Sequence, residues 1–386
     1  MFLKNSKFDL NNPDWTMYNK LPSVVKCRHT RVRPTVNVEM PKGANNAYYT
    51  GLAICGSIWT CPLCCHAIQE TRRREVERLF DWVYGELEGK KIVMVTFTVP
   101  HYAHQSCKYL KDNVSKALRS LKSGRAFSNW RESSGFMGLV RALEVTWGLN
   151  GWNVHTHELF VVDDDVDADE MKRFLTERWE LACNKRGLIP KGRIKAFRRN
   201  AVDITDNARS SAYLAKTDES KSMVWGADRE VTGMHLKNAC KAVDPENPKG
   251  LTPFQLVYAD MSGVRGAWDR FVEYVEAFKG SRALFWSHGL KDLAGVDDIE
   301  DEDAANDGPE TEDPLFVLSA DQWRYIRDNN FKTDILDIAE NAGAVGLRHW
   351  LSKQDIPDYD VQLIDESIAD DWGVMRIMKS AYRYDD

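Results

Sequence analysis

Apolar, β-branched residues cluster in stretches that predict strands, and these are residues 92–99, 138–147, 152–162 and 201–204. Between them, residues 109–124 and 167–187 repeat apolar side chains at helical spacing, and each stretch ends at a glycine, which predicts two helices. The resulting order of strand, helix, strand, strand, helix, strand is the split βαβ pattern. We therefore expect an α+β fold of the ferredoxin-like type, with a four-stranded antiparallel sheet, helices on one face, and the first and third strands in the centre.

Different patterns precede and follow this unit. Residues 67–89 carry an apolar stripe after an irregular cysteine-bearing region, which predicts another helix. Residues 296–314, "VDDIEDEDAANDGPETEDP", are acidic and nearly free of large apolar side chains, which predicts a disordered linker. The chain is thus expected to divide into a cysteine-rich segment with a basic helix (1–90), the split βαβ unit with the helix after it (91–220), an extension (221–295), the linker (296–313) and a small, mostly helical C-terminal module (314–386).

Two histidines lie in the third expected strand, in "GWNVHTHELFVV". Side chains alternate between the two faces of a strand, so His155 and His157 project to the same side. If the hairpin turn centres on Leu149 and Asn150, Glu144 lies directly across from His155, and Ala142 lies across from His157. Such a pair also occurs as ordinary core or half-exposed residues. Two imidazoles and a carboxylate on a free sheet face are nevertheless a typical open site for a divalent cation.

A short helix is expected directly after the last strand, in "TDNARSSAYLAKTDES". Tyr213 and Lys216 are three residues apart in it and share a helix face. A helical tyrosine is usually a packing residue. Beside a metal site it becomes a candidate nucleophile.

The net charge of −6 hides an uneven distribution. Residues 291–386 contain 9 basic and 25 acidic residues, a net charge of −16, which leaves +10 on residues 1–290. Basic clusters of this kind contact phosphate backbones, although they are also common on ordinary solvated surfaces. The candidate DNA-binding residues are Arg72, Arg73, Arg74, Arg193, Lys195, Arg198 and Arg199.

Several motifs occur together in one order and carry a resemblance to a known family. They are "VTFTVPH" (95–101), "RALEVTWG" (141–148), "NVHTHELFVV" (153–162), "SAYLAK" (211–216), "LTPFQL" (251–256) and "FWSHGL" (285–290). With the cysteine-rich segment before them, the chain resembles the HUH-type rolling-circle replication initiators of plasmids and phages over residues 27–290.

That resemblance implies an HUH endonuclease domain that nicks and rejoins single-stranded or hairpin DNA at a replication origin. Glu144, His155 and His157 would hold Mg²⁺ or Mn²⁺, and Tyr213 would attack the scissile phosphate and form a 5′-phosphotyrosyl link, with Lys216 stabilising charge. The free 3′-hydroxyl would prime a host polymerase. Because no helicase motor is visible in the sequence, unwinding would require a host helicase.

The chain also departs from the family pattern. Relatives often have a third histidine before the pair, where this chain has Asn153 and Val154. Some relatives keep a glutamate about one turn before the tyrosine, and Arg209 and Ser210 stand there instead. Asp206, two helical turns before Tyr213, is the nearest replacement.

Five of the eight cysteines lie in the first 65 residues, which in a reducing compartment favours metal ligands over disulfides. In "CGSIWTCPLCCH", Cys55, Cys61 and Cys64, with Cys27 upstream, are similar to the family's zinc segment, and soft thiolates suit structural Zn²⁺. Cys65, His29 and His66 are alternatives for one ligand position.

Three other interpretations compete with the replication initiator. A transposase or a conjugative relaxase uses related chemistry, but relaxases place the tyrosine ahead of the histidine strand, and single-tyrosine transposases are usually shorter. A non-catalytic zinc-containing DNA-binding regulator explains the cysteines and cations but gives the histidine pair and Tyr213 no purpose. No run of about 18 apolar residues occurs, so we expect a cytoplasmic protein without a membrane span.

Overall fold

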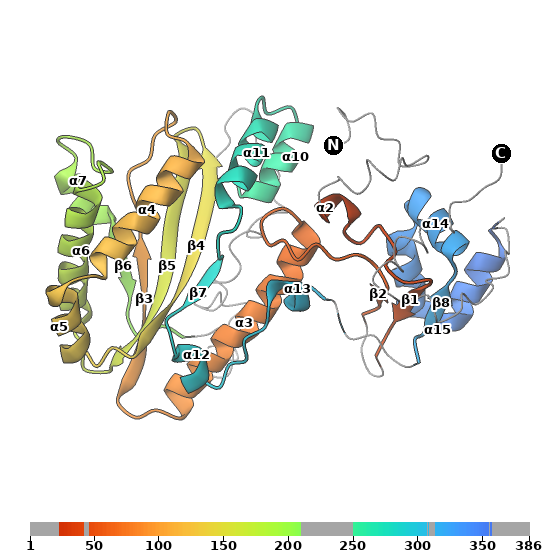
Figure 1. Ribbon diagram of the computed structural model, residues 1–386, viewed down its shortest axis with the longest axis horizontal. Helices are drawn as coiled ribbons and strands as arrows, with labels where there is room; N and C mark the ends of the chain where they lie inside the picture. Colours follow the sequence, from red (N-terminus) through yellow and green to blue (C-terminus); the bar gives the residue numbers. More distant parts are fainter. Residues whose placement is uncertain are drawn as a thin grey trace, which may run out of the picture. The chain divides into compact units, whose positions relative to one another are not determined.

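The computed structural model describes residues 23–41, 46–209, 250–306, 308, 313–354 and 356 (Figure 1). It divides the chain into two compact units, one formed by residues 58–304 and the other by residues 1–57 together with 305–386. Tyr213 and Lys216 lie outside the described residues.

The unit of residues 58–304 is built on an antiparallel five-stranded sheet. In spatial order its strands are β6 (Val202–Thr205), β3 (Lys90–Phe97), β5 (Gly151–Asp163), β4 (Gly138–Gly148) and β7 (Leu284–Trp286). The predicted order is confirmed for the first four strands, with β3 and β5 in the centre. The short strand β7 was not predicted, and it extends the sheet beyond β4.

Two helices cover one face of this sheet, α4 (Cys107–Leu121) and α6 (Ala168–Asn184), as Figure 1 shows. Each begins at a side-chain cap, since Ser106 accepts from the backbone of Tyr109 and Asp167 from that of Glu170. Trp179 fixes α6 on the sheet: its ring lies 5.3 Å from that of Phe97 and its Nε1 donates to the Thr98 carbonyl at 2.9 Å. The shorter helices α5 (Arg125–Ser133) and α7 (Ile194–Asn200) follow α4 and α6.

Helix α3 (Pro62–Gly85) covers part of the opposite face, so the prediction of helices on one face only is wrong. Val76, Leu79 and Val83 of α3 form a buried cluster with Leu159 and Val161 of β5. The side chains of those two β5 residues point to the same face of the sheet as His155 and His157. The apolar stripe of α3 needs an apolar surface, and this half of the face provides one. Helix α3 therefore belongs with the large sheet rather than with a separate segment 1–90.

Residues after 250 join the same unit. Helices α10 (Pro253–Met261) and α11 (Ala267–Phe278) pack together, and α11 contacts α4. Glu273 on α11 accepts from the backbone nitrogen of Cys107 at 2.8 Å and from Trp152 Nε1 at 3.1 Å. This carboxylate therefore links α11 to the start of α4 and to β5.

The first part of the acidic stretch is ordered, contrary to the prediction of a disordered linker. After α12 (Leu290–Leu293), Val296 packs against the α3 cluster, and α13 (Asp301–Ala304) contacts α3. Composition suggested disorder because the stretch has few large apolar residues. The chain nevertheless contacts α3 through an ion pair between Asp301 and Arg72, through the Ile299 carbonyl, which accepts from Arg72, and through α13 with its buried Ala304.

The second unit has a three-stranded antiparallel sheet and three described helices. The elements in chain order are α2 (Ser23–Lys26), β1 (Val36–Glu39), β2 (Tyr48–Thr50), β8 (Phe316–Leu318), α14 (Ala320–Asp328) and α15 (Lys332–Ser352). Strand β8 pairs with β1, so the C-terminal residues complete a sheet with the N-terminal segment instead of forming a separate helical module. Trp323 is buried against Tyr49, with ring centroids 5.1 Å apart, and donates to the His29 carbonyl.

Candidate metal sites

Glu144, His155 and His157 meet on one face of the large sheet. Glu144 on β4 pairs with His155 on β5, and Ala142 pairs with His157, which is the predicted register. The Nε2 atoms of His155 and His157 lie 3.3 Å and 3.1 Å from Glu144 Oε2. The small Ala142 leaves the space across from His157 that the Glu144 side chain uses.

The group is more enclosed than the expected open platform. Exposed fractions of the side chains are 13% for His155 and 8% each for His157 and Glu144. Burial opposes ionisation of Glu144, but the hydrogen bonds and charges of the two imidazoles outweigh it, so the pKa of Glu144 lies well below its ordinary value. An ionised carboxylate held this way is ready to bind a cation.

The donor atoms fit one metal ion. One atom from each of Glu144, His155 and His157 can be chosen so that all lie within 4.8 Å of one another. Two imidazole nitrogens and a carboxylate oxygen suit divalent first-row metals, and three protein ligands leave coordination positions for other molecules. His155 Nδ1 is buried and has no hydrogen-bond partner within the part of the chain that the structure describes. The structure thus brings the three predicted residues together.

Thr96 is a residue of this site that the sequence did not single out. It lies directly across from His157 on β3, and its Oγ1 is 3.0 Å from His157 Nδ1. A hydrogen-bond partner at Nδ1 fixes the orientation of the imidazole ring and leaves Nε2 as the atom that can bind a metal ion. Predicting it required the register between β3 and β5, which are separated along the chain by two helices and a strand.

His101 also lies near the group. The pKa of His101 is lowered by burial, and the charge of His155 contributes to the shift. His101 ends the sequence "VTFTVPH", which supported the resemblance, but its position beside His155 follows only from the path of the chain after β3.

The reverse side of β5 carries a buried ion pair. Glu158 is fully buried, and one of its oxygens lies 2.5 Å from Lys122 Nζ, just after α4. Burial lowers the pKa of Lys122, and Glu158 opposes that shift. Because Glu158 follows His157 directly, this pair anchors the strand that presents the histidines.

Four cysteines form a second group of metal-ligating side chains. The sulfurs of Cys27, Cys55, Cys61 and Cys64 all lie within 4.8 Å of one another. A tetrahedral zinc with Zn–S bonds of about 2.3 Å separates its sulfurs by about 3.8 Å, so this group could hold zinc. Cys65, the nearest alternative, is fully buried outside the group, and burial raises its pKa well above the ordinary value, which opposes the thiolate form.

The basic residues differ in how accessible their side chains are. Arg72 is bound by Glu75 and Asp301, and Arg73 by Glu70 and Glu77, with exposed fractions of only 13% and 17%. Arg74 is exposed. The predicted residues on or just before α7 are all exposed, and these are Arg193, Lys195, Arg198 and Arg199. Arg198 is paired with Glu180, at 3.0 Å between Nη2 and Oε1.

Asp206, the suggested replacement for the missing glutamate, is bound by a neighbouring cation. Its Oδ1 lies 2.9 Å from Lys91 Nζ. Arg209, at the position of that glutamate, stacks on Tyr84 with 4.0 Å between its guanidinium carbon and the ring centroid. Tyr84 Oη in turn donates to the Ala208 carbonyl at 2.7 Å, so the segment after β6 is held against α3.

Fold and site together define the class: an α+β protein with antiparallel sheets and two groups of side chains able to hold metal ions. The chain belongs to the Rep_1 replication protein family, whose family model matches residues 52–331. The matched region contains Glu144, His155, His157 and three of the four clustered cysteines.

Two curated relatives extend the comparison. A protein named "Protein rep" from Streptomyces lividans is 24% identical over 410 residues, covering 86% of this chain and 87% of that protein. A protein named "Neomycin resistance protein" from Streptomyces cyanogenus is 29% identical over 159 residues, covering 34% of this chain and 36% of that protein. No solved structure is significantly similar to the chain. Among the described residues, every helix is too short or too polar to cross a membrane.

Proposed function

We propose that this replication protein is an HUH-type initiator that nicks and rejoins single-stranded DNA at the origin of a plasmid or phage replicon. The observation that carries the proposal is the convergence of Glu144, His155 and His157 on one face of the sheet, in a chain of a replication protein family. A DNA-binding regulator has no use for three converging cation ligands at this place.

Each side chain of the site has a separate role in this reaction. Glu144, His155 and His157 hold a divalent cation, Mg²⁺ or Mn²⁺, which when bound neutralises charge on the scissile phosphate. Tyr213 supplies the nucleophile: its Oη bonds to phosphorus, the bond from phosphorus to the 3′ oxygen breaks, the phenolic proton is lost and the 3′ oxygen takes up a proton. Lys216, one helical turn after Tyr213 if the expected helix forms, offsets phosphate or phenolate charge. The products are a 5′-phosphotyrosyl link and a free 3′-hydroxyl, and the reverse reaction rejoins the strand.

Other parts of the chain support this reaction. Zn²⁺ bound to Cys27, Cys55, Cys61 and Cys64 has a structural role at the start of α3. The exposed cations around α7, together with Arg74, contact the DNA backbone. A host helicase unwinds the duplex and a host polymerase extends the 3′-hydroxyl in the cytoplasm. Arg72 and Arg73 are left out of this surface because carboxylates of the protein bind them and, unlike Arg198, their side chains are mostly buried.

A nicking assay tests the proposal. A labelled hairpin oligonucleotide carrying the origin is incubated with protein and Mn²⁺, and the cleaved strand is resolved after denaturation. Wild type should cleave it, whereas Tyr213→Phe and His157→Gln should not. Tyr258→Phe is a matched control, because Tyr258 is an exposed tyrosine on α10 and should cleave like wild type. Cleavage by Tyr213→Phe at the wild-type rate would refute the mechanism.

A further inference from the structure

The ordered acidic segment has no role in the nicking reaction. Residues 297–303, "DDIEDED", contain six acidic residues in seven, and we call them the acidic strap. Its two ends are anchored by apolar contacts, since Val296 packs against the α3 cluster and Ala304 is buried. The charged residues between them are held over α3 and α12.

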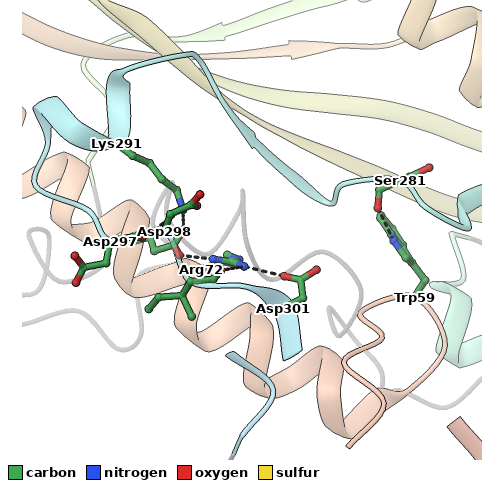
Figure 2. A network of polar contacts seen from close by, with 9 residues as sticks. Trp59, Arg72, Ser281, Lys291, Asp297, Asp298 and Asp301 are labelled. Carbon is green, nitrogen blue, oxygen red and sulfur yellow. Dashed lines mark hydrogen bonds and ion pairs between the residues drawn. The ribbon is translucent and has the colours of Figure 1, made fainter. Parts of the chain in front are cut away.

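The strap binds two cations of the sheet unit, as Figure 2 shows. Arg72 Nη2 lies 2.8 Å from Asp301 Oδ1 and donates to the Ile299 carbonyl at 2.6 Å. Lys291 Nζ lies 3.0 Å from Asp298 Oδ1 and donates to the Asp297 carbonyl at 3.4 Å. Backbone carbonyls and carboxylates of the strap thus present to Arg72 and Lys291 the acceptor chemistry that a phosphate backbone would present.

These cations line a cavity of about 470 Å³ whose other walls include β7 and the strap itself. Leu284 of β7 pairs with Ala142 of β4, which pairs with His157 of β5. The cavity wall is therefore two strands away from the candidate metal site, or about 10 Å at about 4.8 Å per strand. Leu284 and Trp286 pack in the same cluster as Leu159 and Val161, so they lie on the face that carries the histidines.

Another anion could replace the contacts that the strap makes with Arg72 and Lys291. Asp298 is 89% exposed and Asp301 43% exposed, and ion pairs in water contribute only about 0–1 kcal/mol each. Tethering at both ends nevertheless gives the strap a local concentration in the millimolar range. Any occupation of Arg72 and Lys291 by the strap therefore raises the apparent dissociation constant for non-specific single-stranded DNA, which for such proteins is about 10⁻⁴–10⁻⁶ M.

We propose that the acidic strap is an intramolecular competitor of DNA, which occupies Arg72 and Lys291 until single-stranded DNA bound at the sheet displaces it. The strap thereby weakens binding to non-specific DNA more than binding to the origin, whose additional contacts outweigh the competition. This inference rests on the proposed function, because it takes single-stranded DNA as the ligand.

The test measures binding of a fluorescent single-stranded oligonucleotide without origin sequence, without added Mg²⁺ or Mn²⁺, between 50 and 200 mM salt. Asp298→Asn/Asp301→Asn removes the two carboxylates of the strap that bind the cations, while Glu75 of α3 stays paired with both Arg72 and Lys291 in every variant. Asp164→Asn/Asp165→Asn is the matched control, since it removes the same charge at exposed positions of the turn between β5 and α6. The full-length chain is used throughout.

The strap variant should bind more tightly at 50 mM salt. Its plot of log affinity against log salt concentration should have a slope steeper by about 1.4, which is about 0.7 for each of two additional phosphate contacts. Its loss of affinity between 50 and 200 mM should be about sevenfold larger than that of wild type. The control should behave as wild type. Adding Lys291→Met to the strap variant should reduce the slope by about 0.7, whereas in wild type it should change little.

Three results would overturn the inference: an equal gain in the control, no gain in the strap variant, or a gain that Lys291→Met leaves intact. Should the double variant fail to fold in a thermal melt, Asp298→Asn alone provides the same comparison at a mostly exposed side chain, with about half the change in slope. Failure of the nicking proposal is separate, because it appears as absent cleavage by wild type and not as a change in oligonucleotide affinity.

Discussion

Replacing Thr96 by valine should weaken binding of a divalent cation at Glu144, His155 and His157 while leaving the fold intact. The Thr96 hydroxyl is 3.0 Å from His157 Nδ1, and the His157 side chain is 8% exposed. When Nε2 binds a metal, the neutral ring carries its proton at Nδ1 and donates it to Thr96. Valine has the same shape but cannot accept that proton, so the ring loses its orientation and its buried N–H loses its partner.

The expected loss of metal affinity in Thr96→Val depends on how many of the metal ligands the substitution affects. Loss of such a supporting hydrogen bond weakens metal binding by about 10-fold to 100-fold. Thr96 supports only one of the three ligands, so we expect the lower end, about tenfold or about 1.4 kcal/mol. Mn²⁺ binding is measured by calorimetry on protein that retains its zinc.

Two variants make this measurement specific. Thr96→Ser keeps the hydroxyl and should restore most of the affinity. Thr98→Val removes a hydroxyl that donates to the Asn200 carbonyl rather than contacting a histidine, and it should bind Mn²⁺ like wild type. Wild-type affinity in Thr96→Val, or equal weakening in Thr98→Val, would refute the positioning role of Thr96.

Three more predictions concern the four clustered cysteines and the two cores. Cys61→Ser/Cys64→Ser should lose its zinc in elemental analysis of the purified protein, and retained zinc would reject the ligand set. Lys122→Met leaves the carboxylate of Glu158 buried without its cation, which should lower the free energy of unfolding in urea by about 3–5 kcal/mol, and Lys122→Met/Glu158→Leu should recover most of that loss. Trp323→Ala should destabilise the second unit by about 3–5 kcal/mol and make residues 23–57 sensitive to limited proteolysis; unchanged protection there would contradict the shared sheet.

The central sheet could be predicted because its signals are local. Alternating apolar residues in β4 and β5, joined by a short turn, determine which side chains face each other, so Glu144 could be placed across from His155 before the structure was known. The order of strands and helices along the chain, the split βαβ pattern, placed β3 and β5 in the centre. The cysteine group was accessible for a similar reason, since Cys55, Cys61 and Cys64 lie within ten residues.

What could not be predicted depends on contacts between distant segments. The apolar stripe of α3 predicted a helix but not the sheet face that it covers. Thr96 required the β3 to β5 register, and β8 is a three-residue strand whose pairing with β1 spans most of the chain. The acidic strap was misjudged because composition measures the lack of apolar residues, whereas Arg72 and Lys291 supply ionic partners instead.

The central claim is that a cation held by Glu144, His155 and His157 enables Tyr213 to attack DNA. Mass spectrometry of the proteolysed product from wild type, origin oligonucleotide and Mn²⁺ tests it most directly. The account predicts one nucleotide-modified peptide, linked through Tyr213 and formed only with the divalent cation. A modified peptide centred on another residue, or no modified peptide although the oligonucleotide is cleaved, would contradict it.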